Sequence, residues 1–171
     1  MPDFSFEQNI PDLFAPVNGL VAGVDEAGRG PWAGPVVAGA VIFPNLEISE
    51  HLCETLNDSK KLTAAKREAL FDELHQSNAL IGCGSASVEE IDTLNILQAT
   101  FLAMRRAIGA LPVKPEYALI AGNKVPPNLP CPAQAVIKGD ALSLSVAAAS
   151  IIAKVTRDRL MTELAKEFPY Y

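Results

Sequence analysis

Two acidic residues stand side by side near the start of the chain, directly after an apolar run. Asp25 and Glu26 follow "LVAGV" (20–24), a stretch typical of a buried strand. Neighbouring side chains on a regular strand point to opposite faces of the sheet. Both carboxylates can therefore serve one site only if the strand stops and the backbone turns where they stand, and we expect it to do so.

Two other expected strand ends carry polar residues. "LIAGNK" (119–124) leads into a loop, and "VIKGD" (136–140) ends in Asp140. Ligand sites in α/β sheets lie outside the carboxyl ends of strands. If the three ends are neighbours, Asp25, Glu26 and Asp140 form a cluster of like charges. Three unrelated solvated turns are the alternative.

Clustered carboxylates raise one another's pKa unless a positive charge lies among them. A hard divalent cation with oxygen ligands, Mg²⁺ or Mn²⁺, meets that need, and the scattered histidines and cysteines do not favour zinc. Several basic residues lie near the same strand ends or along the last helix: Lys60, Lys61, Lys138, Lys154, Arg157 and Arg159. Such cations beside a metal suit a phosphodiester substrate, although a solvated helix face is the alternative reading.

The stretch "GRGPWAG" (28–34) follows the two acids. It lacks the spacing of a P-loop, and no dinucleotide-binding glycine pattern follows a strand. Its glycines expose backbone N–H groups to which a ligand can come close. We expect this loop to contact the ligand.

Composition narrows the class of protein. The chain has 171 residues, of which 49% are hydrophobic and 20% charged, as in one ordinary globular domain. A net charge of −6 argues against a nonspecific nucleic-acid binder, but not against a local basic track. No membrane-spanning run or signal peptide is recognisable, and three scattered cysteines favour a reducing compartment. We expect a cytoplasmic monomer with an irregular N-terminal arm (1–19) before one domain (20–171).

The pattern of the remaining chain predicts an α/β fold. A second strand at 35–43 follows the first closely enough for an antiparallel pair, and further strands are expected at 80–88, 117–120 and 133–137. Helices are expected from Thr63 to Asn78, from a Ser87–Glu90 capping box to Ile108, and over 144–168. A hairpin followed by alternating helices and strands implies a mixed sheet flanked by helices.

Five segments together resemble ribonuclease HII. They are "GVDEAGRGPWAGPVVAGAVI", "LNDSKKL", "EIDTLNILQATFLAMRRAI", "YALIAGNKVP" and "KGDALSLSVAAASIIAKVTRDRLM". The similarity runs from about Leu20 to the last residue, with the segments in order and suitably spaced. One motif alone would be weak, but five in series are very specific.

The resemblance implies a ribonuclease H-like fold and an endonuclease with two-metal chemistry that cuts the RNA strand of RNA–DNA hybrids. It also implies incision 5′ of single ribonucleotides embedded in duplex DNA. Family enzymes hold Mn²⁺ or Mg²⁺ with four carboxylates, and Asp25, Glu26 and Asp140 match three of them. The Gly28-Arg29-Gly30 loop matches the element that recognises the ribose 2′-hydroxyl. Lys60 and Lys61 match positions that contact phosphate.

Two departures from the family pattern affect the expected activity. The family has Asp-Gly-Asn where this chain has Ala121-Gly122-Asn123, so the fourth carboxylate is missing. The family also continues beyond the closing "FPYY" into a Lys-Gly-Tyr segment whose Tyr packs on the ribose, and that Tyr has no counterpart in this sequence. We expect a ribonuclease of low activity. The alternatives are a module that binds ribonucleotide-containing duplex without cutting it, and a metal-dependent phosphohydrolase of small substrates.

Overall fold

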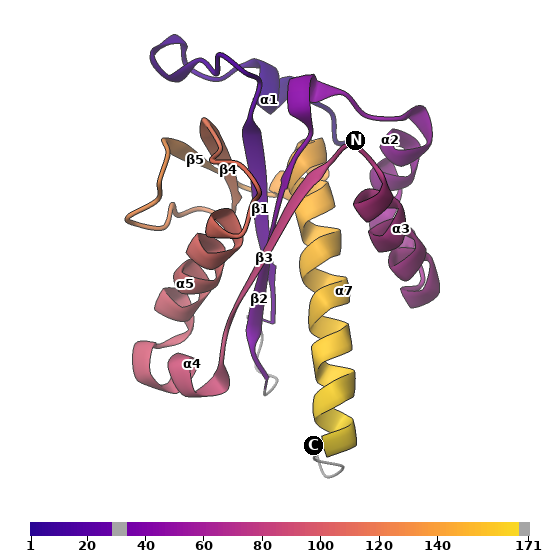
Figure 1. Ribbon diagram of the computed structural model, residues 1–171, viewed down its shortest axis with the longest axis vertical. Helices are drawn as coiled ribbons and strands as arrows, with labels where there is room; N and C mark the ends of the chain where they lie inside the picture. Colours follow the sequence, from indigo (N-terminus) through magenta and orange to yellow (C-terminus); the bar gives the residue numbers. More distant parts are fainter. Residues whose placement is uncertain (29–33, 168–171) are drawn as a thin grey trace.

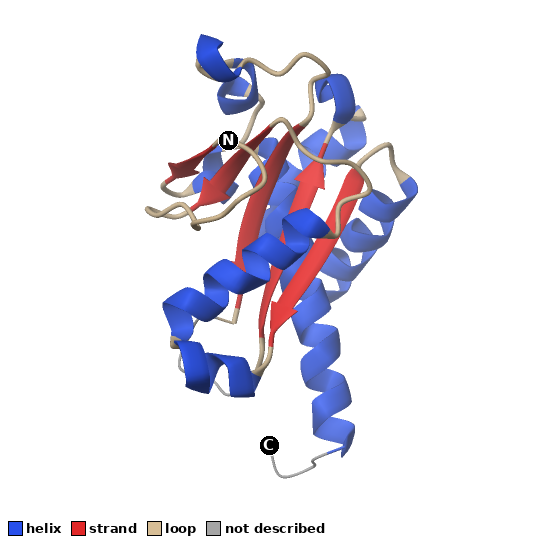
Figure 2. Ribbon diagram, turned by 60° about the vertical axis from the view of Figure 1, so that its left-hand side comes forward, coloured by secondary structure: helices blue, strands red, loops and turns tan. Residues whose placement is uncertain are grey.

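The computed structural model describes residues 1–28 and 34–167, which form a mixed five-stranded sheet with helices on both faces (Figure 1, Figure 2). The strands are β1 (Val21–Ala27), β2 (Val36–Ile42), β3 (Leu80–Ala86), β4 (Tyr117–Ala121) and β5 (Ala133–Val136). Their order across the sheet is β3-β2-β1-β4-β5. The predicted α/β class and mixed sheet are confirmed.

The direction of the strands decides where a ligand site can form. β1 and β2 are antiparallel, as predicted for the hairpin, and β2 and β3 are also antiparallel. In contrast, β1 pairs with β4, and β4 with β5, in parallel. The carboxyl ends of β1, β4 and β5 therefore lie side by side at one edge. Neighbouring strand ends are what a cluster of Asp25, Glu26 and Asp140 requires.

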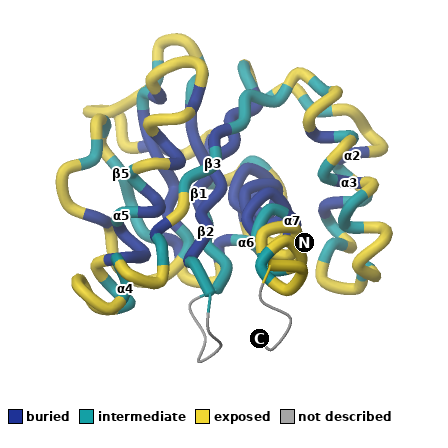
Figure 3. The backbone as a smooth tube through the Cα atoms, turned by 60° about the horizontal axis from the view of Figure 1, so that its bottom comes forward, coloured by how far each residue is buried: buried dark blue, intermediate teal, exposed yellow. Residues whose placement is uncertain are grey.

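Two helices cover opposite faces of the sheet (Figure 1). The helix α5 (Ile96–Gly109) packs on β2 and β3, and α7 (Leu144–Glu167) packs on β1 and β2. The first half of α7 is apolar on all sides and buried, as its sequence predicts (Figure 3). It is buried because α2 (Glu50–Asn57) and α3 (Ala64–Gln76) contact the side of α7 that faces away from the sheet.

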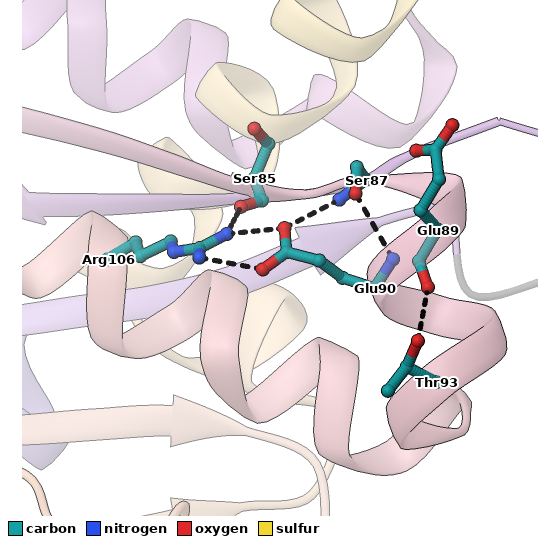
Figure 4. Close-up of polar contacts among 6 residues, drawn as sticks. All are labelled: Ser85, Ser87, Glu89, Glu90, Thr93 and Arg106. Atoms are coloured by element: carbon teal, nitrogen blue, oxygen red, sulfur yellow. Dashed lines mark hydrogen bonds and ion pairs between the residues drawn. The ribbon is translucent and has the colours of Figure 1, made fainter.

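The helix predicted from the capping box to Ile108 is divided into two. α4 (Val88–Leu94) begins with the predicted box, in which Ser87 and Glu90 each accept a hydrogen bond from the other's backbone N–H (Figure 4). Asn95 then takes a φ of 75°, which interrupts the helix, and its side chain accepts a hydrogen bond from Gln98 N at 3.0 Å to start α5. With a ψ of 166°, Asn95 lies in a backbone region that residues other than Gly rarely adopt, and its side chain is a favourable N-cap, so one residue both ends and starts a helix.

The first nineteen residues, for which we expected no regular structure, contain two short helical segments. These are α1 (Ser5–Gln8) and the 3₁₀ turn η1 (Asp12–Phe14). Phe4 packs edge-on against Phe43, with ring centroids 5.9 Å apart, and Ile10 is buried against the ends of β1, β4 and β5. The N-terminal arm is therefore part of the packed structure, and a domain boundary at residue 19 stays a prediction.

Three short elements complete the description. They are the 3₁₀ turns η2 (Pro44–Leu46) and η3 (Ser59–Lys61), and the single-turn helix α6 (Gly139–Leu142). The turn η3 carries Lys60 and Lys61, and α6 carries Asp140. Both matter because they bring charged residues to the carboxyl edge of the parallel strands.

Candidate active site

The two adjacent acids are held by β1, near its end. The prediction that the strand stops at these acids is wrong, because the pairing of β1 with β2 continues through Asp25, Glu26 and Ala27. The backbone N–H of Glu26 donates a hydrogen bond of 2.8 Å to Asp25 Oδ1, which fixes one oxygen of that carboxylate. Both acids thus lie in the paired part of β1, yet their side chains interact, because the charge of Glu26 raises the pKa of Asp25. The backbone turns at Gly28, where φ is 94°.

The sheet register places Ala121 beside Asp25. Val24 pairs with Ile120, so the next residues along these parallel strands are Asp25 and Ala121. Ala121 in turn pairs with Val136 on β5. A carboxylate at position 121 would therefore start from the strand that adjoins Asp25, as the resemblance implies for the fourth ligand.

A tight turn after β5 brings Asp140 to the same edge. Lys138 adopts the left-handed conformation, and Ala141 N donates to Lys138 O at 2.9 Å. Gly139 is buried, and a Cβ there would lie 3.6 Å from Ala121 Cα. The turn therefore rests directly on the end of β4, next to the strand that carries Asp25 and Glu26.

The pKa of Asp25 depends on both of the other acids. Burial raises the pKa of Asp25 well above its ordinary value, and the negative charges of Glu26 and then Asp140 raise it further. Its hydrogen bond from the Glu26 backbone opposes this shift without cancelling it.

The residues fit a hard divalent cation in the type of their ligand atoms. Glu26 Oε2 is buried and accepts no hydrogen bond from any described residue, so it is an oxygen ready for a ligand. Within residues 1–28 and 34–167, however, no three acidic, histidine or cysteine side chains already enclose a possible metal position. Asp25, Glu26 and Asp140 would therefore have to converge further on binding a cation.

Lys60 is the described cation that forms an ion pair with this cluster. Its Nζ lies 3.7 Å from Asp140 Oδ2, and 62% of the Lys60 side chain is exposed. An exposed pair at this distance contributes little stability. Lys61 is exposed on the same turn, and no described contact brings it to the acids.

The glycine-rich loop is described only at its two ends. Arg29 and Gly30 lie outside the described residues, so their predicted role has no structural account. Gly28 passes so close to α7 that a Cβ there would lie 2.1 Å from Arg157 Nε, and the same Nε donates to Pro35 O at 3.0 Å. Arg157 thus fills the space between the two ends of the loop.

A family model and several known ribonucleases match the sequence of this chain. The family model described as ribonuclease HII matches residues 22–171. A ribonuclease HII from Jannaschia sp. (strain CCS1) is 55% identical over 170 residues, covering 99% of this chain and 79% of the relative. One from Ruegeria pomeroyi is 56% identical, covering 99% of this chain and 69% of the relative.

This chain belongs to the ribonuclease HII family. Members of this family are endonucleases that hydrolyse RNA in RNA–DNA hybrids and depend on divalent metal ions. The crystal structure of the ribonuclease H2 from Pyrococcus horikoshii OT3 has a TM-score of 0.73 at 35% identity, covering 86% of this chain and 76% of that one. Bst-RNase HIII, solved in complex with Mn²⁺, has the same fold, with a TM-score of 0.71 at 19% identity. The ribonuclease H-like fold is therefore confirmed.

Other expectations have more limited support. None of the helices in the described parts of the chain has the length and apolar character needed to cross a membrane.

The sequence analysis gave no role to Glu7, which the structure buries against Ser143 and Ser145. No local pattern signals such a contact, because 136 residues or more separate the partners.

Proposed function

We propose that this ribonuclease HII chain binds RNA–DNA hybrids and duplex DNA containing single ribonucleotides, and that it cuts them slowly, on the 5′ side of the ribonucleotide. One observation carries the proposal. Glu26 and Asp140 both act on Asp25 near the ends of parallel strands, and a buried oxygen of Glu26 has no hydrogen-bond partner among the described residues. A buried excess of negative charge is unfavourable unless a cation and its ligand complete the site.

The proposed roles follow from position. Asp25, Glu26 and Asp140 would hold a divalent cation, Mn²⁺ or Mg²⁺, and the cation would attract the scissile phosphate to the site. When bound, such cations lower the pKa of an attacking water and stabilise the leaving 3′ oxygen. Lys60, at the exposed rim beside Asp140, attracts a neighbouring phosphate of the same strand, and we assign Lys61 the same task on the basis of the family motif.

Selection of RNA over DNA is assigned to Gly28, Arg29 and Gly30. The supporting observation is that Gly28 needs a positive φ and has no room for a side chain, so this end of the loop has a defined backbone path. A loop whose backbone N–H groups reach the 2′-hydroxyl distinguishes ribose from deoxyribose, whereas phosphate contacts carry no such information.

A second candidate function is binding without cleavage. It is favoured by Ala121, whose methyl group stands beside Asp25 in the sheet register and cannot ligate a cation. Losing one acid weakens the hold on metal, but it also removes a negative charge from the surface that meets phosphate. Substrate binding is therefore expected to survive better than cleavage.

A labelled duplex with one embedded ribonucleotide distinguishes these functions. The proposal predicts slow nicking 5′ of that ribonucleotide in Mn²⁺ or Mg²⁺ and none after chelation, with an all-DNA duplex as the matched control. A retarded but uncut band supports the binder. Neither a nick nor a retarded band would contradict both readings and leave a phosphohydrolase of small substrates. A cytoplasmic location and a monomeric state stay predictions.

A further inference from the structure

The N-terminal arm is joined to the turn that carries Asp140. Asp3 N donates to Leu142 O at 3.3 Å, and Leu144 N donates to Asp3 O at 2.9 Å, so Asp3 forms a parallel bridge with Ser143. These backbone hydrogen bonds lie directly after α6. The arm is therefore attached to the last residues of the Asp140 turn by main-chain contacts that any sequence could make.

Glu7 adds a side-chain contact that is specific to this sequence. Its side chain is buried, with 3% of the residue exposed, and Oε2 accepts hydrogen bonds from Ser145 Oγ at 2.8 Å, Ser143 Oγ at 3.1 Å and Ser145 N at 3.2 Å. Ser143 Oγ itself accepts a hydrogen bond from Val146 N at 3.2 Å. Oε1 of the same carboxylate is buried without a hydrogen-bond partner among the described residues, and burial raises the pKa of Glu7, so the contact depends on the three hydrogen bonds to Oε2. Glu7 thus fixes the beginning of α7.

The same segment is held from the opposite side by β1. A Cβ at Gly23 would lie 2.2 Å from the carbonyl carbon of Ser145, so the strand and the helix start are in direct backbone contact. Gly23 lies two residues before Asp25. The start of α7 is therefore fixed between Glu7 and the strand that carries two of the three acids.

The remaining link runs from Ser143 back to Asp140. Ser143 N donates to Gly139 O at 2.7 Å, which closes the turn around Asp140. Only Ala141 and Leu142 separate Asp140 from Ser143, so a displacement of Ser143 would move the Asp140 turn relative to β1. The distance between Asp140 and the pair Asp25–Glu26 thus depends on where Glu7 holds Ser143.

We propose that Glu7 is a positioning residue for the metal site: through Ser143 and Ser145 it sets the place of Asp140 relative to Asp25 and Glu26. This inference rests on the proposed function. Groups that orient metal ligands from behind change metal affinity by about 10- to 100-fold in other proteins. Glu7 does not touch the ligands, so its effect is expected near the lower end of that range.

The test measures Mn²⁺ affinity by isothermal titration calorimetry, well below the unfolding temperature of every variant. Glu7→Ala is expected to weaken Mn²⁺ binding by about 10-fold. Phe4→Ala serves as the matched control, because Phe4 anchors the same arm by packing edge-on against Phe43, whereas the side-chain hydrogen bonds to Ser143 and Ser145 belong to Glu7. It is expected to lower the thermal midpoint while leaving Mn²⁺ affinity within about twofold of the wild type.

A purely structural role for Glu7 predicts another result. Glu7→Ala and Phe4→Ala would then both lower the midpoint, and both would bind Mn²⁺ as the wild type does, which overturns the inference. If Glu7→Ala does not fold, Ser145→Ala decides. It removes the shortest hydrogen bond to Glu7 Oε2, 2.8 Å from Ser145 Oγ, and unchanged affinity in that variant overturns the inference. Absence of Mn²⁺ binding by the wild type would instead refute the proposed function.

Discussion

Two carboxylates of this protein, Glu90 and Asp25, show opposite behaviour. Glu90 forms two hydrogen bonds of 2.7 Å with the guanidinium of Arg106, which also donates to Ser85 O (Figure 4). This ion pair, together with the backbone N–H of Ser87, lowers the pKa of Glu90 to about 2. No cation among residues 1–28 and 34–167 forms an ion pair with Asp25, and burial together with Glu26 and Asp140 raises its pKa.

The difference separates an acid with a structural role from acids that need a ligand. The Glu90 carboxylate is satisfied at every oxygen by α4 and α5, so it closes a capping box and ties two helices together. The oxygens of the cluster around Asp25 are incompletely satisfied, and that arrangement does not stabilise a fold by itself. A cluster of this kind is typical of a functional site, where perturbed pKa values concentrate.

The largest expected effect comes from completing the cluster. Ala121→Asp adds a fourth carboxylate beside Asp25, and we expect single-turnover cleavage of a ribonucleotide-containing duplex to rise by on the order of 10²-fold, since catalysis depends on how precisely the reacting groups are placed. Ala121→Asn is the matched control, because it has nearly the same shape without the charge. Equal gains in both variants, or a gain in neither, would show that residue 121 is not a metal ligand position.

A smaller effect is expected when the cluster loses one charge. Asp25→Asn should raise the thermal midpoint of the metal-free protein near neutral pH by about 2–4 °C, the shift that about 1 kcal/mol produces in a protein of this size. The pKa of Asp25 is raised in the folded state, so ionising this carboxyl destabilises the fold. The protein has its full stability below the ordinary pKa of 3.8 and loses part of it as the pH rises through the folded-state pKa.

The pH dependence makes this prediction specific. The stability advantage of Asp25→Asn should vanish below about pH 3.8 and grow as the pH rises, in thermal melts recorded in the presence of a chelator. The same variant should lose most of the stabilisation that Mn²⁺ gives the wild type. A variant that is less stable than the wild type at neutral pH would show that Asp25 is a structural acid like Glu90.

The smallest effect concerns the structural pair. The pKa of Glu90 is lowered from 4.5 to about 2, so its contribution to stability is present above pH 4.5 and is lost as the pH falls toward 2. In Glu90→Gln, the loss of stability between pH 4.5 and pH 2 should be shallower, with no change in Mn²⁺ binding. Glu89→Gln is the control, because Glu89 is exposed on the same turn and its side chain points away from Arg106 (Figure 4). If both variants lose the same stability between pH 4.5 and pH 2, Glu90 is not the structural acid described above.

Much of the fold could be predicted from local signals. The Ser87–Glu90 capping box, the N-cap at Thr63 and the apolar run of α7 depend on neighbouring residues only, and all three are confirmed. The break at Asn95 was not predicted, because the apolar stripe continues through it and only the backbone conformation reveals two helices. The extension of β1 through Ala27 was likewise missed, since it depends on pairing with β2.

The candidate site could be predicted only in part. The proximity of Asp25 and Asp140 follows from the rule that parallel strands end at one edge, and the structure brings both residues there together with Lys60. The contact of Glu7 with Ser143 and Ser145 joins residues more than 130 positions apart, so no periodicity or spacing reveals it. The roles of Asp25, Glu26 and Asp140 as ligands, and of Gly28, Arg29, Gly30, Lys60 and Lys61 toward substrate, stay predictions.

The most direct test of the central claim is the affinity of the metal-free protein for Mn²⁺, measured by calorimetry for the wild type, Asp140→Asn and Ala121→Asp. If the acids at the ends of β1, β4 and β5 form one incomplete metal site, the wild type binds Mn²⁺ weakly, Asp140→Asn loses most of that affinity, and Ala121→Asp binds more tightly. If all three proteins bind Mn²⁺ equally well, or none binds it, the acid cluster is not a metal site and the account is contradicted.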